Sequence, residues 1–521
     1  MMKSNQTKIS TIQLVLLSTG GMIGSGWLFA PYYGFQTAGI GVLVSWLITS
    51  LLTLIIGFSF AEVSGLLPIV GGISRFIGVT HNKTMAFIFL GLSWLSYVVY
   101  LPLEAQSAIQ YLGFWWNGLV SHSGSGEIEL SKIGLFLAFA IIIGLTWFNT
   151  LFISRVARAN FWVSLWKLVI PLGVALLLIF VYGKSSNVVI NYKAVPLSFE
   201  NILLAITTSG LAFAFTGFQN GLVLANSTEN PKKALSYSIF YPIILGGIIY
   251  FCLSLAFITC LSPEKRIAFN AIAPLLGLVT LFAIHTVYVI LFIDAVIAPL
   301  GTANVFTAVT GRVLYGLGKD FLPGGNILVR LNKYSAPSIC LWISAIIGMG
   351  FLLPFPTWKE LVNFLSSIVV FAYLAGPITL LILRHEFPDH QRHFKVKGYR
   401  IVGYLGFACC SLLIYWSGLN NLSWLSALLI VVTIGYALVS KKDSALTTLK
   451  NSWVIIVYLF GITLISYLHH TKWLAFPEDN GLIILFGFVF CKLMVLTRLP
   501  KITINTNLAT LNSEIHDYDR E

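Results

Sequence analysis

Charged residues are scarce in this 521-residue chain, at 10% of the total, whereas hydrophobic residues make up 57%. The mean hydropathy is +0.86. A water-soluble globular fold is excluded, because a soluble chain of this length could not bury so much apolar surface. The composition therefore predicts an integral membrane protein, most of whose residues have lipid as their solvent.

Cysteine is also sparse, and the six cysteines show no metal-ligand spacing. We expect them to be small buried hydrophobes rather than disulfide partners. No nucleotide-binding P-loop is present, so ATP is not expected to supply energy. No metal or cofactor is predicted. The apolar run near the N-terminus is too long for a signal peptide and lacks a cleavage site, so we interpret it as a span.

Apolar windows long enough for helices to cross a bilayer recur along the whole chain. They do not alternate as the strands of a β-barrel would, so we predict an all-α polytopic protein. Fourteen spans are predicted, at 10–34, 39–61, 85–112, 132–152, 157–182, 202–226, 237–261, 279–309, 336–354, 358–383, 401–420, 422–440, 452–468 and 481–497.

The net charge of +13 is distributed as membrane topology requires. With a cytoplasmic N-terminus and fourteen spans, 24 Lys and Arg residues fall on the cytoplasmic side and 7 on the outside. This positive-inside bias predicts that both termini are cytoplasmic. The basic loops, including 384–400, are then topology anchors beside lipid rather than nucleic-acid sites. The tail after Pro500 is polar, and we expect it to be mobile.

Glycine is concentrated in the middle of two predicted spans. The stretch STGGMIGSGWLFAPYYG, residues 18–34, contains five glycines, and the span at 202–226 contains Gly210, Gly217 and Gly221. Glycine weakens a helix, so these segments either are interrupted or pack closely through small residues such as Gly20 and Gly24. These two spans are the first members of two successive blocks of five spans each. Because each block crosses the membrane an odd number of times, the two blocks would have opposite orientations.

Interruption would expose backbone dipoles at membrane depth, which is tolerated only beside a polar cavity. N–H groups near Gly24–Trp27 would then bind an anion such as an α-carboxylate. Carbonyl groups at Gly20–Met22 and around Phe213–Gly217 would accept from an α-ammonium. Phe215 and Trp27 flank the breaks as possible walls, although most aromatic residues here are core or lipid-facing. The predicted substrate-binding residues are Gly21, Met22, Ile23, Gly24, Ser25, Gly26, Trp27, Phe213, Phe215 and Gly217.

Several segments resemble signatures of the amino acid–polyamine–organocation (APC) superfamily. They are GGMIGSGWLFAPYY, AEVSGLLPIVGGISRF, FAFTGFQN…ENPKKAL, SRVARANFWVSLWKLVIPL and ANVFTAVTGRVLYGLGKD. GSGWLF, LPFPTWKELVN and IYWSG are similar to the bacterial aspartate:proton symporter branch. The chain departs from the family where a glutamate is usual, with Gln219 after the sixth-span Gly-Phe and Ser227 before Asn-Pro. A gate that uses either acid is therefore in doubt.

The resemblance implies a LeuT-type fold with two inverted five-helix repeats and additional C-terminal helices. The predicted parts are a ten-helix core at 1–383, with repeats at about 10–182 and 202–383, four further spans at 384–500 and a polar cytoplasmic tail at 501–521. In sodium-coupled relatives a sodium ion occupies the place of Lys167. We therefore expect Lys167 to exchange a proton beside the Gly21 or Ile23 carbonyl, or to be a fixed brace. Charges at membrane depth are costly, so Glu104 and Asp294 are further candidates for proton coupling.

The predicted function is secondary active transport of an amino acid, with protons as the coupled ion, in a cell membrane. An amino acid exchanger is the nearest alternative. A channel or a membrane-embedded enzyme, such as an acyltransferase, is disfavoured, because the external loops are short and poor in clustered catalytic residues. The resemblance points to an acidic substrate, although no arginine lies mid-span to bind a second carboxylate. The oligomeric state is left open.

Overall fold

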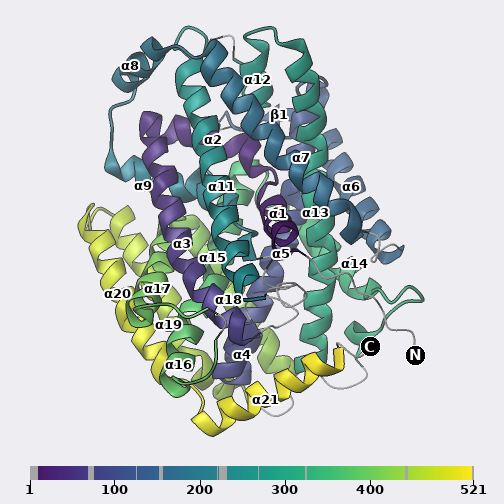
Figure 1. The fold of residues 1–521 in the computed structure, drawn as a ribbon, viewed down its shortest axis with the longest axis vertical. Helices are drawn as coiled ribbons and strands as arrows, with labels where there is room; N and C mark the ends of the chain where they lie inside the picture. Colours follow the sequence, from purple (N-terminus) through teal and green to yellow (C-terminus); the bar gives the residue numbers. More distant parts are fainter. Residues whose placement is uncertain are drawn as a thin grey trace.

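The computed structural model describes residues 10–518 apart from 68–74, 125, 152–155, 220, 222–230, 268, 323–325, 393 and 441–443. The fold is about 80% helical, arranged as a tall bundle (Figure 1). By length and composition, eleven helices or helix runs of the described chain can cross a membrane. A twelfth is counted if α8 and α9, which meet at 101°, form one span.

The first half of the chain supplies the elements that surround the first break. In chain order they are α1 (Thr11–Met22), α2 (Gly26–Ala38), η1 (Gly39–Gly41), α3 (Val42–Leu66), α4 (Phe76–Thr80), α5 (Lys83–Leu112), η3 (Asn117–Leu119), β1 (Val120–His122), β2 (Ile128–Leu130), α6 (Lys132–Leu151), α7 (Val156–Leu177) and the π-helical turn η4 (Leu178–Tyr182). β1 and β2 form an antiparallel hairpin, in a loop where no strand was predicted.

The second half repeats the pattern of a broken helix followed by long ones. Its elements are α8 (Ser185–Ala194), α9 (Phe199–Thr208), α10 (Leu211–Ala214), α11 (Pro231–Cys260), α12 (Pro274–Thr280), α13 (His285–Phe321), η6 (Ile327–Val329), α14 (Ser338–Phe351), α15 (Trp358–Tyr373) and α16 (Ala375–Glu386). The C-terminal part contains α17 (Tyr399–Trp416), α18 (Leu419–Val439), α19 (Ala445–His470), α20 (Glu478–Leu496) and α21 (Lys501–Tyr518).

Each of the fourteen predicted windows overlaps at least one of these helices, although α14 has only 14 residues. α5 and the run from α15 to α16 form the centre, because 94% and 100% of their most apolar windows are buried. The corresponding windows of α6, α7, α18 and α20 are only 33% buried, so most of each faces outward. The central helices therefore lie where a site at membrane depth would be enclosed.

Two segments outside the spans have contacts that the sequence did not reveal. The polar tail after Pro500 forms α21, whose Ile504 and Leu508 side chains are buried. The basic loop 384–400 does not only face lipid. Both Arg384 and Arg392 turn inward to the buried Glu62 carboxylate of α3, at 2.8 and 3.0 Å. Apolar positions and one buried acid hold these polar segments against the bundle.

Candidate functional site at two interrupted helices

The first predicted interruption is present. α1 ends at Met22 and α2 begins at Gly26, and Ile23 between them has non-helical angles of φ −84° and ψ 84°. The α2 helix therefore begins inside the bundle with backbone N–H groups that no earlier helical turn satisfies. Ser25, in that gap, is fully buried, so these groups need partners from other helices.

The second interruption separates α9 from α10 at Ser209 and Gly210, where Gly210 has φ +81°. Beyond α10, Gly217 has φ +105°, a conformation that essentially only glycine adopts. A Cβ atom built on Gly217 would lie 2.6 Å from the Gly21 carbonyl oxygen, so the two interrupted segments touch. The segment at 222–230, which contains Ser227 of the family motif, lies outside the described residues.

Tyr250 of α11 joins the two breaks. Its hydroxyl group lies 2.9 Å from the carbonyl oxygen of Ala214 and 3.4 Å from that of Met22. A carbonyl group of each break therefore accepts a hydrogen bond from a tyrosine of the protein, and the binding of a substrate α-ammonium at these carbonyls stays a prediction. The sequence did not indicate a role for Tyr250, because no motif distinguishes it from the other tyrosines in apolar helices.

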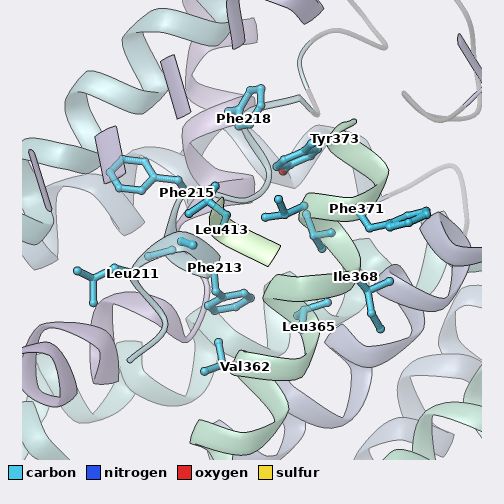
Figure 2. Packing of buried hydrophobic residues seen from close by; sticks show 14 of the residues in the cluster. Leu211, Phe213, Phe215, Phe218, Val362, Leu365, Ile368, Phe371, Tyr373 and Leu413 are labelled. Carbon is cyan, nitrogen blue, oxygen red and sulfur yellow. The ribbon is translucent and has the colours of Figure 1, made fainter. Parts of the chain in front are cut away.

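The aromatic residues around the second break point in different directions, as Figure 2 shows for Phe213 and Phe215. Phe213 faces α2, since a Cβ on Gly26 would lie 3.4 Å from its Cδ1 atom. Phe215 instead packs against Trp46 and Tyr250, with ring centroids at 5.9 and 5.7 Å. Trp27 is fully buried, and its Nε1 atom has no hydrogen-bond partner within the described chain.

Lys167 of α7 links the first break to α13. It is 4% exposed, and its Nζ atom donates to Thr302 Oγ1 at 2.8 Å and to the Gly20 carbonyl at 3.4 Å. The predicted acceptors were the Gly21 or Ile23 carbonyl, so the predicted contact is wrong by one residue along α1. Thr302 was missed, because a threonine in a helix more often bonds its own backbone. Three helices thus meet at one buried ammonium group.

Glu104 of α5 occupies the position that the sequence predicted for a substrate anion. The Ser25 N–H group, at the start of α2, donates to both carboxylate oxygens, at 2.9 and 3.2 Å. The positive end of the α2 dipole favours a negative charge at this point. In the structure this helix terminus therefore binds a carboxyl group of the protein itself, and the binding of a substrate α-carboxylate here stays a prediction.

Asp294 of α13 is the third residue predicted to take part in proton coupling, and it is buried. Trp166, next to Lys167 on α7, donates from Nε1 to Asp294 Oδ1 at 2.8 Å. The second oxygen, Oδ2, has no hydrogen-bond partner within the described residues. The Trp166–Asp294 contact therefore joins α7 to α13, as the Lys167–Thr302 contact does. Glu104 of α5 instead contacts the start of α2.

Gly20 and Gly24 show that close packing and interruption are not exclusive. A Cβ on Gly20 would lie 2.1 Å from Ser164 Oγ of α7, and one on Gly24 would lie 2.6 Å from Glu104 Oε1. Gly20 therefore permits helix packing, and Gly24 gives the Glu104 carboxylate access to the break.

Gln219, at the place of the family glutamate, has a defined role in the structure. Its Oε1 atom accepts from the Gly217 N–H group and from the Tyr373 hydroxyl of α15, both at 3.0 Å. A neutral amide therefore holds the second break against the central helix α15.

Two broken helices that touch each other, beside the buried side chains of Lys167 and Glu104, define a multi-pass integral membrane protein with a polar centre. The comparisons with known proteins then give the family. Residues 9–439 match the family model described as amino acid permease, and the chain belongs to the amino acid permease family. The predicted resemblance to the APC superfamily is thereby confirmed.

Three relatives from Bacillus subtilis (strain 168) cover most of the chain. The aspartate-proton symporter is 29% identical, over 96% of this chain and 98% of its own length. The glutamate/serine transporter AimA is 28% identical, over 93% and 92%. The branched-chain amino acid permease BcaP is 26% identical, over 85% and 95%. All three are transport proteins, and their named substrates differ.

Proposed function

We propose that the chain is a secondary active amino acid transporter that couples uptake to protons by alternating access. The observation that supports this most directly is the contact of two interrupted helices beside Lys167. The exposed backbone dipoles at these breaks match the two charges of a zwitterion. A change in the protonation of Lys167 would alter its bonds to Gly20 and Thr302, and hence the attachment of α1 to α13.

The proposal includes the LeuT-type arrangement, with two inverted five-helix repeats in residues 1–383, fourteen spans and both termini in the cytoplasm. Both proposed repeats begin with a broken helix, α1–α2 in one and α9–α10 in the other. The four later spans at 384–500 would be an addition to this core. α17 packs against α3, and α18 packs against α5, so the first two helices of the addition attach it to the core.

The proposed substrate is an amino acid, with acidic side chains as the leading class. The names of two relatives include aspartate and glutamate. The α-carboxylate would replace Glu104 at the Ser25 N–H group, and the α-ammonium would replace the Tyr250 hydroxyl at the Met22 and Ala214 carbonyls. Loss of the Glu104 charge by protonation would ease the first exchange, which is a direct route to proton coupling.

The test is uptake of a radiolabelled amino acid panel into proteoliposomes, with and without an imposed pH gradient. We expect one class to accumulate only with the gradient, and Lys167→Ala to abolish that accumulation while detergent-solubilised protein remains folded. Counterflow that is independent of pH would instead indicate an exchanger. Full gradient-driven uptake by Lys167→Ala would exclude Lys167 as the coupling residue.

A further inference from the structure

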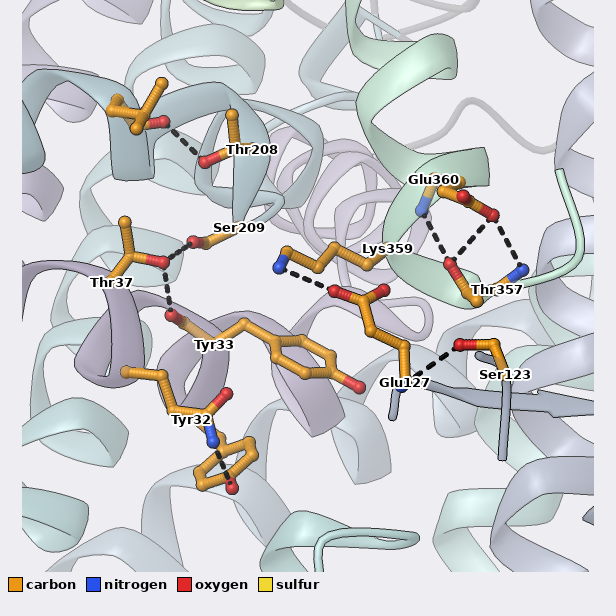
Figure 3. A network of polar contacts seen from close by, with 12 residues as sticks. Tyr32, Tyr33, Thr37, Ser123, Glu127, Thr208, Ser209, Thr357, Lys359 and Glu360 are labelled. Carbon is orange, nitrogen blue, oxygen red and sulfur yellow. Dashed lines mark hydrogen bonds and ion pairs between the residues drawn. The ribbon is translucent and has the colours of Figure 1, made fainter. Parts of the chain in front are cut away.

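The β1–β2 hairpin is fastened to the beginning of α15, on the side that the proposed topology places outside. Glu129 of β2 forms a backbone bridge with Thr357, the N-cap residue of α15. Between the strands, Glu127 Oε1 lies 2.9 Å from Lys359 Nζ. Figure 3 shows the Lys359 side chain reaching from α15 toward Glu127, with the Tyr33 ring beside the pair. An ion pair thus holds the hairpin against the N-terminal end of α15.

A column of aromatic rings leads from this ion pair to the first helix break. Lys359 Nζ is 6.0 Å from the Tyr33 ring centroid. Tyr33 stacks on Trp358 at 5.8 Å, and Trp358 stacks on Phe29 at 4.6 Å. The Trp358 Nε1 atom donates to Ser25 Oγ at 3.1 Å. Lys359 therefore marks the outer end of a column whose inner end is the residue that binds Glu104.

The other acids nearby are already engaged. The Glu360 carboxylate accepts from the Thr357 backbone and hydroxyl groups at 3.2 and 3.1 Å, as the N-terminal cap of α15. Glu129 Oε1 is 3.4 Å from the Ser121 hydroxyl group. Glu127 is therefore the acid that faces Lys359, and no second carboxylate of this group competes for the ammonium.

Water and small anions can reach this pair, because the Lys359 and Glu127 side chains are 34% and 36% exposed. Ion pairs with this exposure contribute at most about 1 kcal/mol. A carboxylate from solution can therefore replace Glu127 without a large loss. The replacement would break the side-chain contact between the hairpin and α15 where the column to the break begins, and would leave the Glu129–Thr357 backbone bridge in place.

We propose that Lys359 is a specificity-determining residue that binds the side-chain carboxylate of acidic amino acids at the outer entrance, with Glu127 as its internal competitor. The inference rests on the proposed function and topology, and deepens them by naming a cation for the second carboxylate. Lys359 lies at the start of α15 and not in the middle of a span, where a cation for the second carboxylate was expected.

The experiment measures KM and kcat for uptake of L-aspartate and L-serine into proteoliposomes, with substrate added on the outer face of the protein, at low and high salt. Lys359→Gln is expected to raise the aspartate KM about fivefold, which corresponds to about 1 kcal/mol, with kcat and the serine KM unchanged. Glu127→Gln is expected to lower the aspartate KM. Lys359→Arg should retain the wild-type value, and the matched control Lys472→Gln, another exposed lysine on the predicted outer side, should do the same. Added salt should shrink each effect.

Support for the inference would be a higher aspartate KM in Lys359→Gln and a lower one in Glu127→Gln, with the serine KM unchanged in both. Shifts in the same direction for both substrates would show that the pair is only a mechanical latch, and would overturn the inference. An unchanged aspartate KM in Lys359→Gln would also overturn it. Wild-type transport of serine without any inhibition by aspartate would refute the inference and leave the proposed function standing. Absence of any amino acid transport by folded wild-type protein would instead refute the proposed function itself.

Discussion

Gly217→Ala tests whether the contact between the two interrupted helices supports the fold and the site. Gly217 has φ +105°, and a Cβ there would lie 2.6 Å from the Gly21 carbonyl oxygen and 3.0 Å from the Met22 nitrogen. Both neighbours are backbone atoms at the first break, so no flexible side chain can move aside. Alanine must therefore either distort its own backbone or separate the two breaks.

The magnitude follows from two costs. A non-glycine residue in a sparsely populated backbone region costs about 1–3 kcal/mol. Overpacking a closely packed position costs about 1–3 kcal/mol more. The sum, about 2–6 kcal/mol, corresponds to at least a 25-fold loss in the population of the state in which the breaks touch. The Tyr250 bonds to both breaks would be strained by the same separation.

The assay is thermal unfolding of detergent-solubilised protein, combined with binding of a transported amino acid. Gly217→Ala should lower the melting temperature and weaken binding. The matched control is Gly435→Ala in α18, since no atom lies within 4 Å of a Cβ built there. That variant should be neutral or more stable by about 1 kcal/mol. If Gly217→Ala unfolds and binds like the wild type, the two breaks do not depend on their contact, and the proposed site is wrong.

Three further predictions concern buried polar groups. Glu62→Ala leaves Arg384 and Arg392 buried without their carboxylate, so the free energy of unfolding should fall by about 3–5 kcal/mol. A loss no larger than that of Glu127→Ala, whose partner Lys359 is 34% exposed, would contradict this. Burial lowers the pKa of His81 from 6.5 to about 4, so the unfolded chain takes up a proton first as the pH falls. Stability should then decrease between pH 6.5 and 4, by at most about 1.4 kcal/mol per pH unit, and His81→Gln should remove that part of the slope in melting experiments; equal slopes would refute it. Glu104→Gln should flatten the pH dependence of uptake, and a wild-type pH profile would exclude Glu104 from coupling.

The helix positions could be predicted because lipid imposes a simple rule. A backbone in hydrocarbon must satisfy its own hydrogen bonds, so spans are long apolar helices that can be recognised without knowledge of their neighbours. The interruption at 23–25 could be predicted for a similar local reason, because five glycines in one span favour a break or a close contact. The order of the motifs gave the family, which the comparison over residues 9–439 confirmed.

The partners across the bundle could not be predicted in the same way. Lys167 was identified as an isolated charge in an apolar span, but its acceptor, Gly20, is fixed by the rotation of α7 against α1. Glu104 was also identified, whereas its bond to Ser25 depends on how α5 packs beside the break. The hairpin contact between Glu127 and Lys359 joins residues 232 positions apart.

The sequence by itself determined that this chain lies in a membrane, where its helices run, and that the first and sixth predicted spans contain glycines at which a helix can be interrupted. Those properties depend on local composition, since each segment meets lipid or a backbone constraint on its own. Only the tertiary structure decided that the two breaks touch, that Glu104 rather than open space faces the α2 terminus, and that Glu62 draws a basic loop inward. Such pairings depend on the relative rotation and depth of separate helices, and no local pattern specifies these.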